Sequence, residues 1–268
     1  MIAELKGVRL GYDDVGAGTA MVFVHGFPHD RTLWSRQIDA LSMHVRCIAP
    51  DLRGFGESST DGPYSVDQYA DDLASLMTHL DIERAIVCGL SMGGYVAMAM
   101  WRRHPQRVIA LALCDTKAGA DNDEGRQKRN DLIALAEREG SVAVAATQLA
   151  GMLGRTTRSR RPDVVATMKA MMERAPVAGI VGALTAMRDR PDARATLATL
   201  SVRTLVLVGD EDALTPVAEA NAIVAALPTP SNVKFEIIEG SGHATCVERP
   251  AAVTHALADF LTSLAVHS

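Results

Sequence analysis

Short apolar runs alternate with longer stretches of helical periodicity along most of this chain. Runs rich in Val, Ile, Leu and Ala are typical of buried parallel strands. We expect such strands at Met21–Val24, Arg46–Ala49, Ala85–Cys88, Val108–Cys114, Thr204–Val208 and Lys234–Ile238. Two earlier runs, Ile2–Leu5 and Val8–Tyr12, predict an antiparallel pair that turns at Lys6-Gly7.

Apolar positions spaced three and four residues apart predict the helices between these strands. Ser65 and Gln68 form a capping-box pattern, so a helix should begin after Ser65. Thr215 and Pro216 predict another helix start, with the proline at the first helical position. Residues 253–264 form a closing amphipathic pattern. Alternating strands and helices imply an α/β fold with a mostly parallel, doubly wound sheet.

This alternation stops between Thr116 and about Thr199. Three stretches of helical spacing follow one another there, with no strand signal between them. A segment of about 80 residues is too long for a connecting loop. We therefore expect residues 1–115 and 200–268 to form the core, and residues 116–199 to form a helical cap. The cap should cover the carboxyl edge of the sheet, where ligands bind in such folds.

Composition narrows the class of protein. The chain has 268 residues, of which 48% are hydrophobic, and this suits one domain with an insertion. Its net charge of -5 argues against a general nucleic-acid partner. The first residues show no basic region followed by an apolar stretch, and no apolar run reaches membrane-spanning length. We expect a cytoplasmic protein with no membrane partner.

The four cysteines show no C-x-x-C spacing, and three of them lie in or beside apolar runs. This pattern favours free, buried thiols in a reducing compartment. The sequence shows no zinc-ligand cluster, no Walker loop and no G-x-G-x-x-G fingerprint. We therefore expect no cofactor and no bound metal.

The chemistry centres on the five residues Gly89-Leu90-Ser91-Met92-Gly93. They follow one predicted strand and open a helical stretch, which is the nucleophile-elbow arrangement. The sharp turn strains the backbone of the serine and needs small residues two positions before and after it. The geometry exposes the hydroxyl and leaves helix N–H groups free to stabilise an oxyanion.

A serine hydroxyl is a weak nucleophile and needs a base, usually a histidine oriented by a carboxylate. Asp210, Glu211 and Asp212 follow the predicted strand Thr204–Val208, and His243 follows the strand Lys234–Ile238. All of them should therefore lie at the same sheet edge as the serine. The order of serine, then acid, then histidine is that of the α/β-hydrolases.

Five segments in this order resemble the α/β-hydrolase fold family, in particular its cap-bearing esterases and 3-oxoadipate enol-lactonase-like proteins. These segments are the oxyanion loop at His25–Pro28, the following loop at Asp51–Ser58, the elbow at Gly89–Gly94, the acid loop at Gly209–Pro216 and the histidine loop at Gly240–Pro250. The resemblance covers nearly the whole chain. It implies the fold more specifically than the substrate.

The resemblance also implies roles for individual residues. Ser91 would attack a carbonyl carbon, and His243 would take its proton and later protonate the leaving alcohol. Asp212 would orient the imidazole and stabilise its charged form. The backbone N–H groups of Phe27 and Met92 would form the oxyanion hole.

Two residues near this set carry alternatives. Asp115 follows the strand after the elbow and is the second candidate for the acid, because some members of the fold place the acid there. In the resembled family, the histidine that corresponds to His25 buttresses the oxyanion loop, so we expect a structural role for it.

The cap offers candidates for substrate contact. An adaptable apolar pocket could be lined by Met152, Met168, Met171, Met172 and Met187. Outside the cap, Trp34 lies just past the oxyanion loop and could also contact substrate. The same spacing also fits ordinary packing between cap and core. A short basic run, made of Arg155, Arg158, Arg160 and Arg161, could steer an anionic substrate or could be a solvated linker.

We therefore expect a serine hydrolase that cleaves a small-molecule carboxylic ester through an acyl-enzyme on Ser91. Enol-lactone hydrolysis and cofactor-free perhydrolysis are alternatives that use the same three residues. A non-catalytic small-ligand receptor on the same fold is the alternative from another class. A homodimer is compatible with the sequence.

Overall fold

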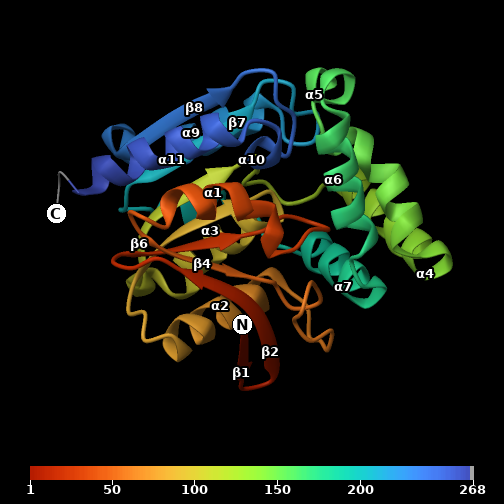
Figure 1. The fold of residues 1–268 in the computed structure, drawn as a ribbon, viewed down its shortest axis with the longest axis horizontal. Helices are drawn as coiled ribbons and strands as arrows, with labels where there is room; N and C mark the ends of the chain where they lie inside the picture. Colours follow the sequence, from red (N-terminus) through yellow and green to blue (C-terminus); the bar gives the residue numbers. More distant parts are fainter. Residues whose placement is uncertain (266–268) are drawn as a thin grey trace.

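The computed structural model describes residues 1–265, which form an eight-stranded sheet flanked by helices (Figure 1). The strands are β1 (Ile2–Leu5), β2 (Val8–Val15), β3 (Ala20–Val24), β4 (Arg46–Pro50), β5 (Ala85–Leu90), β6 (Val108–Cys114), β7 (Thr204–Gly209) and β8 (Val233–Ile238). Their spatial order is β1-β2-β4-β3-β5-β6-β7-β8. Strand β2 runs antiparallel to β1 and β4, and the remaining neighbours are parallel. The expected mostly parallel α/β sheet is confirmed.

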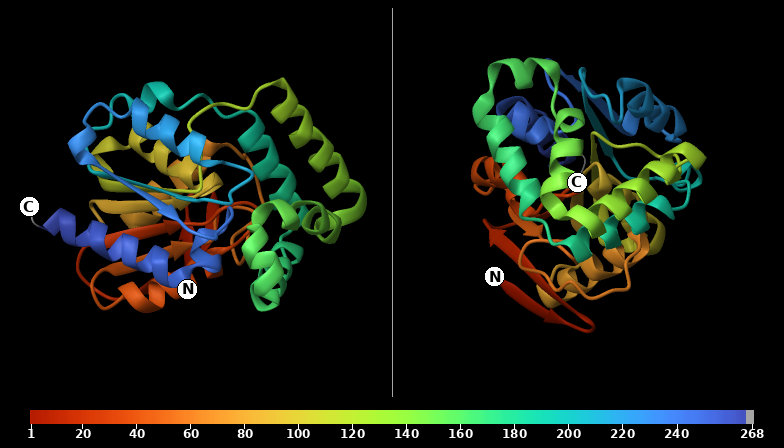
Figure 2. Two further views of the ribbon diagram at one scale, coloured as in Figure 1. Left: turned by 90° about the horizontal axis from the view of Figure 1, so that it is seen from above. Right: turned by 90° about the vertical axis from the view of Figure 1, so that its right-hand side faces the viewer.

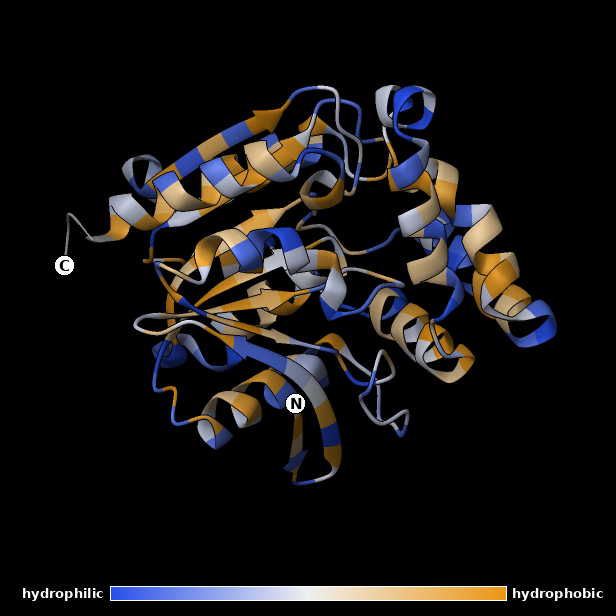
Figure 3. Ribbon diagram, viewed as in Figure 1, coloured by the Kyte–Doolittle hydropathy of each residue, from blue (hydrophilic) through white to orange (hydrophobic). Residues whose placement is uncertain are grey.

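Helices cover both faces of this sheet, so two apolar layers form. Outside the long insertion the helices are η1 (Arg31–Trp34), α1 (Ser35–Leu41), α2 (Val66–His79), α3 (Met92–Arg103), η2 (Pro105–Arg107), α8 (Arg194–Leu197), α9 (Val217–Ala226), η3 (Pro230–Asn232), α10 (Thr245–Glu248) and α11 (Pro250–Ala265). One layer contains apolar side chains of α2, α3 and α9, and the other contains those of α1 and α11. The strands between them are mostly apolar (Figure 3).

The starts of α2 and α9 can be compared with the sequence patterns that predicted them. The Ser65 hydroxyl accepts a hydrogen bond from the Gln68 backbone N–H at 2.9 Å, so the predicted N-cap is confirmed. The Gln68 side chain does not complete the capping box, because its amide donates to Asp72 instead. Pro216 has an extended backbone and caps α9, which begins at Val217. The prediction that this proline is the first helical residue is wrong by one position.

Four helices fill most of the segment between β6 and β7, and none of its residues is in a strand. They are α4 (Asp123–Met152), α5 (Arg155–Arg160), α6 (Pro162–Glu173) and α7 (Val177–Arg188), and we use the word cap for these four helices and the turns between them. Gly140, with φ of 78°, divides α4 at a kink. Helix α4 packs on α6 and α7, and the group stands to one side of the sheet (Figures 1 and 2). Helix α8 packs instead on α3 and α9 of the core, and the boundaries at residues 116 and 199 stay a prediction.

Helix α7 meets the loop after β4 through two glycines. A Cβ atom on Gly179 would lie 1.9 Å from the carbonyl oxygen of Gly54, so the two backbones are in direct contact. Gly54 also has φ of 92°, in the left-handed region that glycine tolerates best. Neither position can accept a larger side chain in this arrangement.

Two expectations from composition can be compared with the structure. The four cysteines are free and buried, as expected. Within residues 1–265, no helix combines the length and the apolar character needed to cross a membrane.

Candidate active site

Ser91 lies at the turn between β5 and α3, with φ of 56° and ψ of -112°. Small residues are needed around it because the chain folds back on itself. A Cβ atom on Gly89 would lie 2.1 Å from the carbonyl oxygen of Gly93, and one on Gly93 would lie 2.2 Å from that of Val24. The strained turn predicted for the elbow is therefore present, and it lets the helix start approach β3.

The structure brings Ser91, His243 and Asp212 together from three separate loops. The Ser91 Oγ lies 2.7 Å from the Nε2 atom of His243. The Nδ1 atom of the same ring lies 2.8 Å from the Asp212 Oδ2 atom. His243 and Asp212 are both buried, whereas Ser91 is partly exposed. The arrangement can pass a proton from the hydroxyl to the imidazole and stabilise the charge that results.

Asp212 is held by more donors than His243 alone. Its Oδ1 atom accepts hydrogen bonds from the backbone N–H groups of Leu214 (2.8 Å) and Thr215 (3.0 Å). Its Oδ2 atom accepts one from the Thr215 hydroxyl at 2.7 Å. Burial by itself would raise the pKa of Asp212, but the charge of His243 and these hydrogen bonds outweigh burial and lower the pKa. The carboxylate therefore stays ionised and fixed in orientation.

Asp115 occupies the second acid position but takes different partners. Its Oδ1 atom accepts from the Gly209 backbone N–H at 3.0 Å, and its Oδ2 atom is hydrogen-bonded to the Thr245 hydroxyl. Burial raises the pKa of Asp115 well above its ordinary value, and the nearby charge of Asp212 adds to this effect. Asp115 thus joins the end of β7 to the histidine loop, whereas Asp212 is the carboxylate hydrogen-bonded to His243.

Glu248 also supports the histidine loop, and the sequence analysis did not identify it. This fully buried side chain accepts hydrogen bonds from the backbone N–H groups of Gly242 (2.9 Å) and Ala244 (3.2 Å), on either side of the histidine. It also accepts one from Gly154 in the segment between α4 and α5, at 2.8 Å. Glu248 therefore links the histidine loop to the cap. The only signal in the sequence was an acidic residue five positions after His243.

The predicted oxyanion donors flank the serine. Met92 is the first residue of α3, and Phe27 lies in the loop after β3. Neither of their N–H groups donates a hydrogen bond to another residue in the described part of the chain. A Cβ atom on Gly26 would lie 3.3 Å from the Ser91 Cβ, so the Phe27 loop packs directly against Ser91.

His25 is buried beneath this loop with both ring nitrogens paired. Its Nε2 atom accepts a hydrogen bond from the Leu52 backbone N–H at 2.9 Å, so the proton must be on Nδ1. The Nδ1 atom lies 2.8 Å from the carbonyl oxygen of Gly26, to which it donates. Burial lowers the pKa of His25, in keeping with a neutral ring. These contacts fit the structural role expected for His25.

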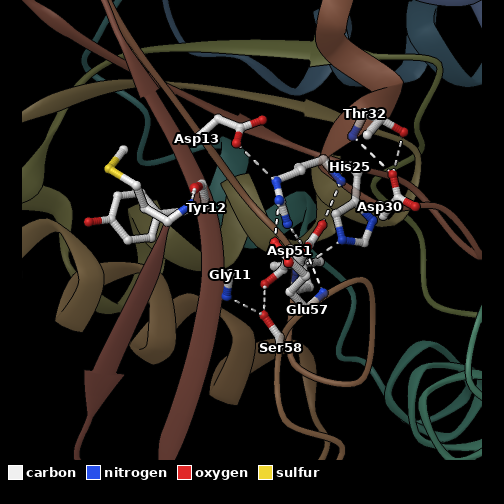
Figure 4. Close-up of polar contacts among 12 residues, drawn as sticks. Gly11, Tyr12, Asp13, His25, Asp30, Thr32, Asp51, Glu57 and Ser58 are labelled. Carbon is white, nitrogen blue, oxygen red and sulfur yellow. Dashed lines mark hydrogen bonds and ion pairs between the residues drawn. The ribbon is translucent and has the colours of Figure 1, made fainter.

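A network of hydrogen bonds and ion pairs also holds the loop after β3 in place (Figure 4). The Asp51 carboxylate is fully buried and accepts from the backbone N–H groups of Arg31 and Glu57, each at 2.8 Å. The Arg31 guanidinium forms ion pairs with Asp51, Glu57 and Asp13. The Ser58 hydroxyl donates to the Asp51 carbonyl oxygen at 2.7 Å. The loop after β3 is thus tied to the loop after β4 and to β2.

The predicted substrate-contact residues are all buried. All but Met187 lie in one apolar cluster that spans core and cap. Trp34 packs against Phe23, with ring centroids 5.4 Å apart. From the cap, the same cluster includes Met152, Met168, Met171 and Met172. Packing accounts for their burial, and their contact with substrate stays a prediction.

The basic run lies on and beside α5, which is hydrophilic (Figure 3). Arg155, Arg158 and Arg160 are exposed, and Arg161 forms an ion pair with Asp163 at 2.8 Å. Among residues 1–265, no group of three or more His, Cys, Asp and Glu side chains is arranged to hold a metal ion.

Comparison with known proteins identifies the family. A family model described as alpha/beta hydrolase fold matches residues 19–250. The chain is 27% identical to 3-oxoadipate enol-lactonase 2 of Acinetobacter baylyi, covering 94% of this chain and 92% of that one. Its structure is similar to that of a thermophilic esterase from Thermogutta terrifontis, with 37% identity, a TM-score of 0.92 and coverage of 96% and 94%.

An enol-lactonase from Burkholderia xenovorans is also similar, with 29% identity, a TM-score of 0.90 and coverage of 98% of this chain and 100% of that one. These matches extend over nearly the full length of each protein. Together with the sheet and the elbow, they show that the chain belongs to the α/β-hydrolase fold family, in its esterase and enol-lactonase-like group.

Proposed function

We propose that this protein hydrolyses a carboxylic ester of a small molecule through an acyl-enzyme on Ser91. The observation that carries the proposal is the continuous hydrogen-bonded chain from Ser91 through His243 to Asp212. Similarity to an esterase of 37% identity supports the same reaction class.

The reaction would proceed in two stages. In the first, the Ser91 Oγ attacks the ester carbonyl carbon while its proton moves to the Nε2 atom of His243. The tetrahedral intermediate then collapses, and the imidazolium gives its proton to the leaving alcohol. In the second stage, His243 takes a proton from water as the water oxygen attacks the acyl carbonyl carbon. The imidazolium then returns this proton to the Ser91 Oγ as the bond to the acyl group breaks and the acid is released. Asp212 stays ionised throughout and stabilises the imidazolium.

The free N–H groups of Phe27 and Met92 would stabilise the oxyanion of both intermediates. Each such donor typically contributes about 3–4 kcal/mol to lowering the barrier. Because the donors are backbone groups, their side chains can change without removing the interaction. The Asp51 network and His25 would keep the Phe27 amide aimed at the oxyanion.

Lactone hydrolysis is a second candidate, favoured by the similarity to two enol-lactonases of 27% and 29% identity. A lactone is an internal ester, so the three residues would act in the same way. The exposed arginines of α5 offer no enclosed site for an anionic lactone.

A fluorophosphonate probe tests the proposal directly. We expect one covalent adduct per chain on Ser91 by mass spectrometry, its loss in Ser91→Ala, and turnover of short p-nitrophenyl esters. A thermal melt of Ser91→Ala checks that the variant is folded. An unlabelled serine together with no ester turnover would refute the enzyme and favour a ligand receptor on the same fold. Adding hydrogen peroxide to the ester assay and measuring peracid tests the perhydrolase alternative.

A further inference from the structure

Three histidines are buried in residues 1–265, and one of them differs from the others. His25 and His243 have hydrogen-bond partners at both ring nitrogens. His29 is 1% exposed, yet neither of its ring nitrogens has a partner among the described residues. Burying a donor and an acceptor without partners costs free energy. An apolar side chain would avoid that cost, so the position calls for a functional explanation.

The position of His29 connects it to the proposed reaction. It follows Phe27 by two residues, and its backbone N–H donates to the Gly26 carbonyl oxygen at 3.0 Å, which closes a turn beside Ser91. Its other chain neighbour, Asp30, is hydrogen-bonded to Arg174 at the end of α6. His29 thus lies in the chain between the loop beside Ser91 and the residue that α6 contacts.

The neighbouring polar groups pair with other residues and not with the His29 ring. The Asp30 carboxylate accepts from the Thr32 N–H at 3.0 Å and from the Arg174 Nε at 2.6 Å. Arg174 also donates to the Thr32 hydroxyl at 2.7 Å. These contacts bridge the cap to the loop after β3 and leave the two nitrogens of His29 as the unsatisfied polar atoms of that turn.

We propose that His29 is a specificity-determining residue that binds an uncharged oxygen substituent of the ester substrate, either a hydroxyl or a keto oxygen. This inference rests on the proposed ester hydrolysis. A neutral imidazole offers one N–H donor and one nitrogen acceptor, which together complement a hydroxyl group, while the donor alone suits a keto oxygen.

Charge argues against a carboxylate in this place. Burial lowers the pKa of His29 to about 3, so the ring is neutral at physiological pH. A carboxylate buried beside it would lack a cation, because Arg174 is paired with Asp30. A plain alkyl chain would leave the ring nitrogens unsatisfied.

Matched esters test the inference. In the acyl arm, methyl β-hydroxybutyrate and methyl acetoacetate are compared with methyl isovalerate, in which a methyl group replaces the hydroxyl, and with monomethyl succinate. In the alcohol arm, hydroxyethyl butyrate is compared with propyl butyrate. We expect the uncharged polar ester of at least one arm to exceed its apolar match by about 10–100-fold in kcat/KM.

Variants assign that preference to the ring. His29→Phe should reduce the ratio to near one, and His29→Gln, which keeps a donor and an acceptor, should restore part of it. His255→Phe, at an exposed histidine of α11, should leave the ratio unchanged. A ratio of rates is insensitive to a general loss of folded protein. Methyl β-hydroxybutyrate should also protect Ser91 from the fluorophosphonate in the wild type more than in His29→Phe.

The outcomes separate the two proposals. Absence of both labelling and turnover refutes the hydrolase itself. If Ser91 is labelled, the His29 inference is overturned by equal rates within both arms, by a preference that survives in His29→Phe, or by a preference for monomethyl succinate. If no ester is turned over, equal protection in the wild type and His29→Phe overturns it.

Discussion

Replacing Asp212 with asparagine is the sharpest test of the proposed mechanism, because the structure dictates how the new side chain must lie. The Leu214 and Thr215 backbone N–H groups both donate to Oδ1, at 2.8 and 3.0 Å. The amide oxygen of Asp212→Asn must therefore occupy the Oδ1 position. The amide NH2 group then replaces Oδ2, which lies 2.8 Å from the Nδ1 atom of His243.

An NH2 group at that point donates a hydrogen bond to Nδ1 and so moves the ring proton to Nε2. The Nε2 atom lies 2.7 Å from the Ser91 Oγ and must be unprotonated to accept its proton. The wrong tautomer costs about 10⁴-fold in kcat in the serine-protease case from which this magnitude is taken. That loss corresponds to about 5.4 kcal/mol, at about 1.36 kcal/mol for each factor of ten.

The assay is steady-state hydrolysis of p-nitrophenyl butyrate, with a thermal melt of each variant as the folding check. Asp115→Asn is the matched control, since it makes the same change in a buried carboxyl that does not contact His243. We expect Asp115→Asn to stay within about tenfold of the wild type, or about 1.4 kcal/mol. An Asp212→Asn variant as active as the control, or an inactive control beside an active Asp212→Asn, would refute the assignment.

Three further predictions concern stability and charge. The pKa of Asp115 is raised in the folded state, so the wild type should lose stability as pH rises above the unfolded pKa of about 4. Asp115→Asn should not show this loss. If the urea midpoints of the wild type and Asp115→Asn differ by the same amount at every pH, the prediction is contradicted. Ser65→Ala removes the cap of α2 and should lower the free energy of unfolding by about 1 kcal/mol in urea titrations, and no change in the midpoint would count against it. Joint replacement of Arg158 and Arg160 by glutamate should change kcat/KM for monomethyl succinate by less than about twofold, because both side chains are exposed. A large loss would instead support electrostatic steering of an anionic substrate by α5.

Short sequence patterns predicted much of the fold and identified the proposed reacting groups. The strand at Val108–Cys114 has the predicted bounds, because a continuous apolar run matches a strand buried on both faces. The elbow at Ser91 was visible because its glycines stand at fixed short spacings around the serine, although Gly93 is required by a contact with the distant Val24 carbonyl oxygen as well.

Other parts of the site depend on contacts between distant segments, which no local pattern records. Glu248 contacts Gly154, 94 positions earlier in the chain, and only the folded cap brings them together. His29 gave no signal because its distinguishing feature is the lack of partners in three dimensions. The cap methionines Met152, Met168 and Met172 were visible in the sequence, but their spacing cannot distinguish packing in the core from contact with a ligand.

The contact between Gly54 and Gly179 has a consequence for changing the substrate range of this protein by directed evolution. A larger residue at either glycine would force α7 away from the loop after β4 and so change the position of the cap on the core. Libraries should therefore keep both glycines and place diversity in α4 and α6, where the cap contributes side chains rather than backbone to its contacts. The start of α5 is fixed in a similar way, because a Cβ atom on Gly154 would lie 2.7 Å from the Gly242 backbone nitrogen. Substitutions are therefore better tolerated on α4 and α6 than on α7 or at the start of α5.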